Sequence, residues 1–540
     1  MLSQVCLVLL ALLCALASVA LADPARVLVA CVANRAAVHN LALVARELQE
    51  ASGLNVTLAV PAEAASWPEV NSTDAGVFPV GAEGEADGDP GGDRAAAAAA
   101  GADDGAFDRL VRRFSQMVGA WEYAERVDSE VWRSQHMYEP LVEAFNNSDN
   151  KPDLMIIDSY TFAAFDVAEA LGVPYVVHHA GLLDAPPFAR AYVPAHGTGY
   201  SIRMRPWERC VNFLIPYLQS LALQPSLRQL NEVRRSRDLL GLSHHFEPWS
   251  DTPFIASAAL GLEYARPLTA STELVGPLER EAGGACGALP AAEPGGSGGE
   301  GGSDEASEAD ISAWLDEPDQ GEVLLISGLA ALSSALLMPL AEALERSQRP
   351  VLWVGDVARR LTYRSPFFRK FEPRDGCDGR FLDHSAISTV FAHCDLHEVH
   401  AAVLAGKPTV CLPTTPHQLD VATRLVDAGA GITLPLGRQG DAFASDLKHA
   451  IFDATQHSSH QRMSRGVRYL AATMSRAGGV QRAAHLVDSF LALGTEHIAP
   501  APMPWYVSSC LDIYAACGAC VLALLVALRA VLWVYGRVLG

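Results

Sequence analysis

The segment His393–Leu434, HCDLHEVHAAVLAGKPTVCLPTTPHQLDVATRLVDAGAGITL, decides the fold of this 540-residue chain. A buried strand is predicted just before it, at Ser388–Ala392, followed by a helix at Leu396–Ala405 and a second strand at Thr409–Leu412. Gly406 closes the predicted helix, because helices commonly end at a glycine. A strand, a helix and a strand in this order predict one βαβ unit of a parallel sheet.

The same alternation extends outward from this unit in both directions. Other strands are predicted at Arg26–Ala33, Asn55–Val60, Asp153–Ile157, Tyr175–Val177, Val323–Ile326 and Val351–Val354, and helices at Ala36–Glu50, Thr161–Leu171 and Leu336–Arg346. We therefore expect two doubly wound α/β domains, residues 23–265 and 266–500. Ligands of such sheets bind beyond the carboxyl ends of the strands, so the cleft between the domains is the expected site.

Composition and charge narrow the class of protein. Half of the residues are hydrophobic, enough for two sizeable cores, and the formal net charge of −22 argues against a nucleic-acid partner. Two low-complexity tracts, residues 81–105 and 281–310, carry seven acids each and one arginine between them, which gives −13 of that charge. Neither tract shows apolar periodicity, so both are expected to be surface insertions.

Both ends of the chain carry apolar segments. Residues 1–22 end in Ala20-Leu21-Ala22 after an apolar run, which is typical of a secretory signal peptide. Residues 506–536 contain a run long enough to cross a bilayer, and Arg529 and Arg537 place residues 537–540 in the cytosol. A single-pass type I protein of the endoplasmic reticulum or another secretory-pathway membrane, with a luminal body, is expected; a buried amphipathic end helix is the alternative. Three N-x-S/T triplets suit a luminal glycoprotein, at Asn55, Asn71 and Asn146.

The order of residues in His393–Leu434 resembles the donor-site signature of UDP-glycosyltransferases. The shared frame has a histidine after a buried strand, Gly406-x-Pro408 at the end of a helix, and Gln418-x-Asp420 near the start of the next. Pro152–Val177 resembles the family's first-domain strand that ends in a catalytic aspartate, and Pro206–Leu218 resembles its membrane-near stretch. The resemblance implies a GT-B fold of two facing Rossmann-like domains, and transfer of a hexosyl group from a UDP-sugar to a small lipophilic acceptor.

The resemblance also implies a catalytic pair in the first domain. In this family a histidine removes the proton of the acceptor, and an aspartate orients the imidazole. Asp158 occupies the aspartate position, whereas the histidine position holds Ala37 and His39 stands two residues later. Two helical positions turn a side chain by about 200°. His39 is therefore the candidate base only with a shifted helix start.

On the donor side the resemblance assigns His393, Gln418, Asp420 and Ser327 to the UDP-sugar. The family's His-Gly-Gly lets backbone N–H groups approach the diphosphate, whereas this chain adds two side chains after His393, one of them charged. The departures from the signature are Cys394, Asp395, Glu398, Ala401, His417 and, at the uracil-binding positions, Asp375 and Asp378. The UDP-sugar would be a substrate, and no resident cofactor or metal is expected.

Several alternatives stay open from the sequence. The chain is either an active UDP-glycosyltransferase or a catalytically inactive pseudo-glycosyltransferase that binds a ligand or a partner at the membrane. His393, His397 and His400 suggest a metal site as a further alternative, although histidines at this spacing more often lie on a surface or an interface. The six cysteines of the luminal body do not specify a pairing.

Overall fold

The computed structural model describes residues 24–32, 35–71, 73–80, 122, 125–183, 192–249, 252–278, 308–317, 321–329, 332–373, 381–435, 440–494 and 511–539. The chain divides into two units, residues 1–495 and 496–540. The predicted signal peptide, the tract 81–105 and residues 281–307 of the second tract lie outside the described residues, as do Asp375 and Asp378.

The first lobe of the large unit is a seven-stranded parallel sheet with the order β3-β2-β1-β4-β5-β6-β7. Its strands are β1 (Arg26–Ala30), β2 (Asn55–Pro61), β3 (Gly76–Val80), β4 (Leu154–Asp158), β5 (Tyr175–His179), β6 (Phe254–Ala256) and β7 (Thr272–Leu274). Its main helices are α2 (Arg35–Ser52), α6 (Tyr138–Phe145), α7 (Phe162–Leu171), α8 (Pro206–Ala222) and α9 (Gln224–Ser236). The central strand β4 reads LMIID and is buried along its whole length, which is typical of a sheet covered on both faces.

The second lobe is a six-stranded parallel sheet with the order β10-β9-β8-β11-β12-β13. Its strands are β8 (Val323–Ile326), β9 (Val351–Val354), β10 (Phe368–Phe371), β11 (Ile387–Ala392), β12 (Thr409–Cys411) and β13 (Gly431–Thr433). Its helices are α10 (Glu308–Leu315), α11 (Ser334–Arg346), α12 (Asp356–Arg360), α13 (Leu396–Leu404), α14 (Pro416–Asp427), α15 (Gly440–Thr455), α16 (His457–Ala477) and α17 (Gly479–Leu493). The structure thus has the two doubly wound α/β lobes that the alternating pattern predicts.

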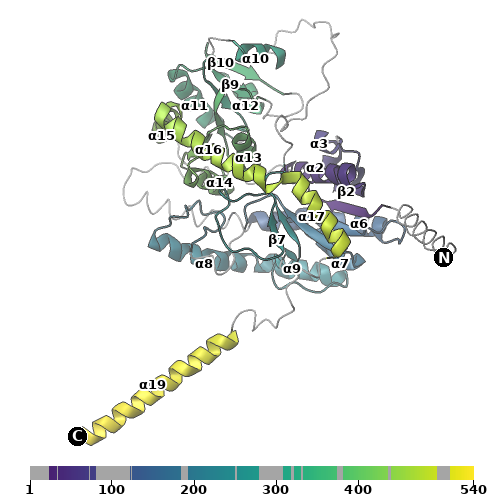
Figure 1. Cartoon of the computed structure of the whole chain (residues 1–540), viewed down its shortest axis with the longest axis vertical. Helices are drawn as coiled ribbons and strands as arrows, with labels where there is room; N and C mark the ends of the chain where they lie inside the picture. Colours follow the sequence, from purple (N-terminus) through teal and green to yellow (C-terminus); the bar gives the residue numbers. More distant parts are fainter. Residues whose placement is uncertain are drawn as a thin grey trace, which may run out of the picture. The chain divides into compact units, whose positions relative to one another are not determined.

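Two details of the first lobe differ from or extend the prediction. The prediction of a strand to Ala33 is wrong, because β1 ends at Ala30. The N–H of Cys31 still donates to the neighbouring strand, but that of Val32 donates to the Thr161 hydroxyl at 3.0 Å, so the chain leaves the sheet there. The last helix of the body, α17, returns to this lobe and packs against α2 (Figure 1). Between these helices, the Ser52 hydroxyl donates to Asp488 at 2.5 Å.

The described part of the small unit, residues 511–539, forms helix α19 (Leu511–Leu539). Its segment Ile513–Val531 has 19 residues and a mean hydropathy of 2.1, and none of it is buried. Among the described residues, this is the one helix that is long and apolar enough to cross a membrane. In the large unit, α8 also exposes apolar side chains, namely Phe213, Leu214, Tyr217, Leu218 and Leu221.

Candidate functional site in the second lobe

The candidate donor residues lie at the carboxyl ends of β8, β11 and β12. Ser327 follows β8, His393 follows β11, and Gln418 is the third residue of α14, the helix after β12. These strand ends meet at one edge of the sheet, because β11 pairs with both β8 and β12 in parallel. The edge is where a doubly wound sheet binds its ligand.

Carboxylates of the chain itself surround the start of α13. Asp395 is the N-cap residue, and one oxygen of Glu398 accepts the N–H groups of Cys394 and Asp395 at 3.0 and 3.2 Å. Any side chain at Gly328 would overlap Glu398 Oε1, so this oxygen lies directly against the backbone of the loop after β8. The space between these two N–H groups and Gly328 is named the α13 cradle below.

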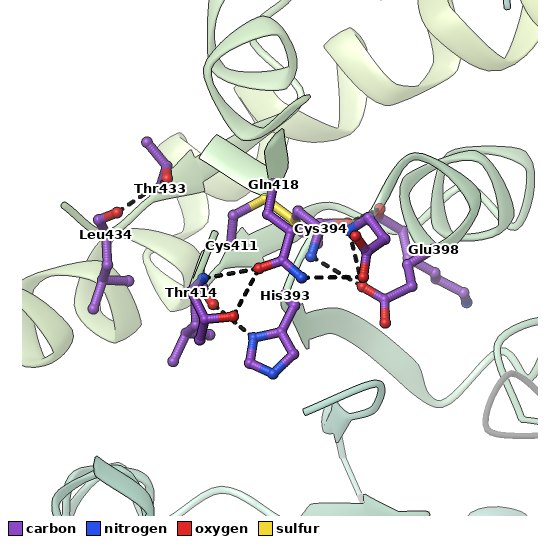
Figure 2. Close-up of a disulfide and its surroundings, with 12 residues drawn as sticks. His393, Cys394, Glu398, Cys411, Thr414, Gln418, Thr433 and Leu434 are labelled. Atoms are coloured by element: carbon purple, nitrogen blue, oxygen red, sulfur yellow. Dashed lines mark hydrogen bonds between the residues drawn. A yellow bond between two sulfur atoms is a disulfide. The ribbon is translucent and has the colours of Figure 1, made fainter. Parts of the chain in front are cut away.

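Gln418 uses both ends of its amide within the second lobe. Its oxygen accepts the N–H and hydroxyl of Thr414 at 2.8 and 3.0 Å and the N–H of Thr415 at 3.2 Å. Its amide nitrogen donates to Asp395 at 3.1 Å, so that Gln418 connects α14 to the edge of the α13 cradle (Figure 2).

His393 is held as a neutral imidazole. Its Nδ1 lies 2.8 Å from the carbonyl oxygen of Leu412, which can only accept, so the proton is on Nδ1. Burial lowers the pKa of His393, and the side chain is 2% exposed. Its Nε2 is a buried acceptor with no hydrogen-bond partner among the described residues.

A disulfide fixes the same edge of the sheet. Cys394 and Cys411 are bonded across the ends of β11 and β12, 17 residues apart in the sequence (Figure 2). Cys394 has a φ of 69°, a left-handed conformation that favours glycine, and glycine is what the resembling family has at this position. The disulfide is therefore one covalent constraint that holds the conformation of the chain at the α13 cradle.

Asp420 has its partners in the first lobe. Its carboxylate accepts the N–H groups of Gly197 and Gly199 at 2.6 and 2.7 Å, and burial raises its pKa. Arg424, one turn later, donates to the buried Glu263 at 2.8 Å, and Asp427 accepts the hydroxyl of Tyr264 at 2.5 Å. This face of α14 thus clamps the two lobes together.

The candidate catalytic residues lie at the carboxyl edge of the first sheet. Asp158 is 1% exposed, and burial raises its pKa to about 7, with a further rise from the charge of Glu130. The N–H of Tyr160 and the hydroxyl of Thr161 donate to it at 3.2 and 3.4 Å, which opposes the rise. Asp158 can therefore exchange a proton near neutral pH.

His39 lies at the boundary between the lobes. Its ring centroid is 5.5 Å from that of His397, on α13 of the second lobe. Ala37, at the position of the family's base, is 1% exposed. The histidine of α2 thus lies against the second lobe.

The described residues contain no group of three or more His, Cys, Asp or Glu side chains arranged to hold a metal ion. In the histidine trio, His400 is 5% exposed, and burial lowers its pKa to about 3. It is therefore a buried neutral residue of α13. Sequence reasoning missed the role of Thr414 and Thr415 as partners of Gln418, for which the sequence holds no signal beyond their position before α14.

No family model matches this chain. Among curated proteins it is 25% identical over 300 residues to 2-hydroxyacylsphingosine 1-beta-galactosyltransferase of Rattus norvegicus, covering 53% of this chain and 50% of that protein. It is 23% identical over 333 residues to UDP-glucuronosyltransferase 1A6 of Oryctolagus cuniculus, covering 58% and 57%. The chain thus spans about half the length of the curated relatives it matches.

Solved structures support the fold. The glycotransferase of kitacinnamycin matches 86% of this chain and 99% of its own at a TM-score of 0.57 and 15% identity. The calicheamicin glycosyltransferase CalG4 matches 87% and 99% at a TM-score of 0.56 and 16% identity. The chain is thus similar in sequence to a galactosyltransferase and a glucuronosyltransferase, and its fold is the GT-B fold of the solved glycosyltransferases.

Proposed function

We propose that this protein transfers a hexosyl group from a UDP-sugar to a small lipophilic acceptor in the space between its two lobes. The observation that carries the proposal is that His393 and Gln418 lie after β11 and β12, which pair in parallel and end at the edge where a doubly wound sheet binds its ligand. The names of the curated relatives, a galactosyltransferase for an acylsphingosine and a glucuronosyltransferase, support a hexosyl group and a lipophilic acceptor.

The first lobe would supply the acceptor side of the reaction. As the bond between the anomeric carbon and the diphosphate breaks, the acceptor oxygen forms the new bond to that carbon and loses its proton to a base. Asp158 and His39 are the candidate groups for that proton, and the pKa of about 7 suits Asp158 to accept it near neutral pH. Ser327 would line the donor side next to the α13 cradle.

We further propose that the protein is anchored by α19 in an endoplasmic-reticulum or other secretory membrane, as a type I protein with a luminal body. Support comes from the apolar segment Ile513–Val531 and from the apolar side chains that α8 exposes. Asn55, Asn71 and Asn146 are all exposed, as luminal glycosylation would require.

A second candidate function is a non-catalytic GT-B protein that binds a ligand or a partner. Two observations favour it. The position of the family's base is the buried Ala37, and the α13 cradle already holds the carboxylate of Glu398. Both would weaken transfer without disturbing the two-lobed scaffold.

Titration of the full-length protein in detergent with UDP and with UDP-sugars, with and without divalent metal, separates the two candidates. UDP at about 100 times its Kd should stabilise the protein by about 2.7 kcal/mol, which is readable as a rise in Tm. Asp158→Asn should abolish hexosyl transfer and leave this rise unchanged, whereas Asp453→Asn on the exposed face of α15 should affect neither. The transferase proposal fails if millimolar UDP leaves the Tm of the wild type unchanged under both metal conditions.

A further inference from the structure

The start of α13 is an anion-binding arrangement that the chain fills itself. Backbone N–H groups at a helix N-terminus attract negative charge. Here the N–H groups of Cys394 and Asp395 both point to Glu398 Oε2, at 3.0 and 3.2 Å. The other oxygen of Glu398 lies against the backbone of Gly328, so the carboxylate spans the α13 cradle from one wall to the other.

A buried polar atom without a partner lies on the residue that precedes the α13 cradle. His393, just before α13, is 2% exposed and keeps its Nε2 without a hydrogen-bond partner among the described residues. Its ring lies close enough to Asp395 for that carboxylate to oppose the lowering of the His393 pKa. A buried polar atom of this kind is costly unless a ligand or an ordered water molecule donates a hydrogen bond to it.

The charges around the α13 cradle disfavour a diphosphate. Asp395 and Glu398 are both half-buried acids, and Gln418 donates its amide to Asp395 instead of to a ligand. A diphosphate entering this space would meet two carboxylates, and the N–H groups of Cys394 and Asp395 already donate to Glu398. It can bind only when the Glu398 side chain turns out of the cradle.

We propose that Glu398 is a built-in occupant of the diphosphate subsite and the residue that determines how weakly this protein binds a phosphate-bearing donor. The inference deepens the proposed function and rests on its assignment of the donor site. Removing the Glu398 carboxylate frees two N–H donors and takes one negative charge away from the subsite. Affinity should therefore rise for UDP and not for uridine, which has no phosphate.

The experiment compares wild type with Glu398→Ser by calorimetric titration of the full-length protein with UDP and with uridine. Glu398→Ser should bind UDP at least tenfold more tightly than wild type, with the uridine affinity unchanged. Glu398→Gln keeps the size of the side chain, removes its charge, and should give a smaller gain in the same direction. It also keeps the test informative if the serine variant fails to fold.

Glu208→Ser is the matched control for the loss of a helix cap. Glu208 is the third residue of α8 and accepts the N–H of Arg205 at 2.7 Å, as Glu398 does at α13, but it lies outside the donor site. This variant should leave both affinities at the wild-type values.

The inference is overturned if UDP binds wild type and both Glu398 variants equally, if none of them binds UDP, or if uridine gains as much as UDP. A gain in UDP affinity with no hexosyl transfer by any variant would support the inference and count against the transferase function. Hexosyl transfer by the wild type, together with equal UDP affinities of the wild type and both Glu398 variants, would support the transferase function and overturn the inference.

Discussion

The free energy of unfolding of the Asp158→Asn variant, measured against that of the wild type, should increase as the pH rises from about 4 to about 7. In the folded protein burial raises the pKa of Asp158 from its ordinary 3.8 to about 7. Between these values the unfolded chain has already lost the proton that the folded protein keeps, so the free energy of unfolding of the wild type falls with increasing pH. The difference between the folded and unfolded pKa values is worth about 1.4 kcal/mol for each unit. The loss of stability of the wild type therefore reaches about 4 kcal/mol at pH 7 and above.

Asparagine carries no proton to lose, so Asp158→Asn lacks this penalty. The free energy of unfolding of the variant, relative to wild type, should gain about 3 kcal/mol between pH 5 and pH 8. Denaturation of both proteins at a series of pH values measures this difference. Asp453→Asn, on the exposed face of α15, is the control for the loss of a surface carboxylate. A difference that stays constant with pH, or one in which the wild type gains, would refute the reasoning.

Three other changes test the second lobe and its contact with the first. Cys411→Ser removes the disulfide to Cys394, which closes a separation of 17 residues, and should lower the free energy of unfolding by about 3 kcal/mol; reductant should then lower the Tm of wild type but not that of the variant. Asp420→Ala removes the acceptor of the Gly197 and Gly199 N–H groups and should cost about 1–3 kcal/mol, so an unchanged Tm would contradict its role in holding the lobes together. Gly199→Ala places a methyl group 2.5 Å from a side-chain atom of α14 and should lower the Tm more than Gly53→Ala, which has a similar positive φ and open space around it.

Much of the fold follows from local sequence. β8 and β9 occupy the predicted residues Val323–Ile326 and Val351–Val354, because short continuous apolar runs mark buried parallel strands well. The end of β1 was not predictable in this way. There the chain leaves the sheet because Val32 bonds to Thr161, a side chain 129 residues away, and no local pattern records such a contact.

The site shows the same division. The sequence identifies Gln418 and Asp395 as members of one edge, but their hydrogen bond depends on how α13 and α14 pack. The pairing of Cys394 with Cys411 likewise needs the register of β11 and β12. The sequence could have predicted that Asp420 and Gln418 lie on different faces of α14, since two positions along a helix turn a side chain by about 200°.

Helix α14 contacts both the candidate donor site and the first lobe, so its position affects both. On one side Gln418 reaches the α13 cradle, and on another side Asp420 and Arg424 hold the first lobe. Rotating this helix to admit a bulkier molecule would pull those charged groups from their partners across the boundary. Substitutions that change the orientation of α14 should therefore also lower stability, whereas changes confined to loops leave these contacts intact.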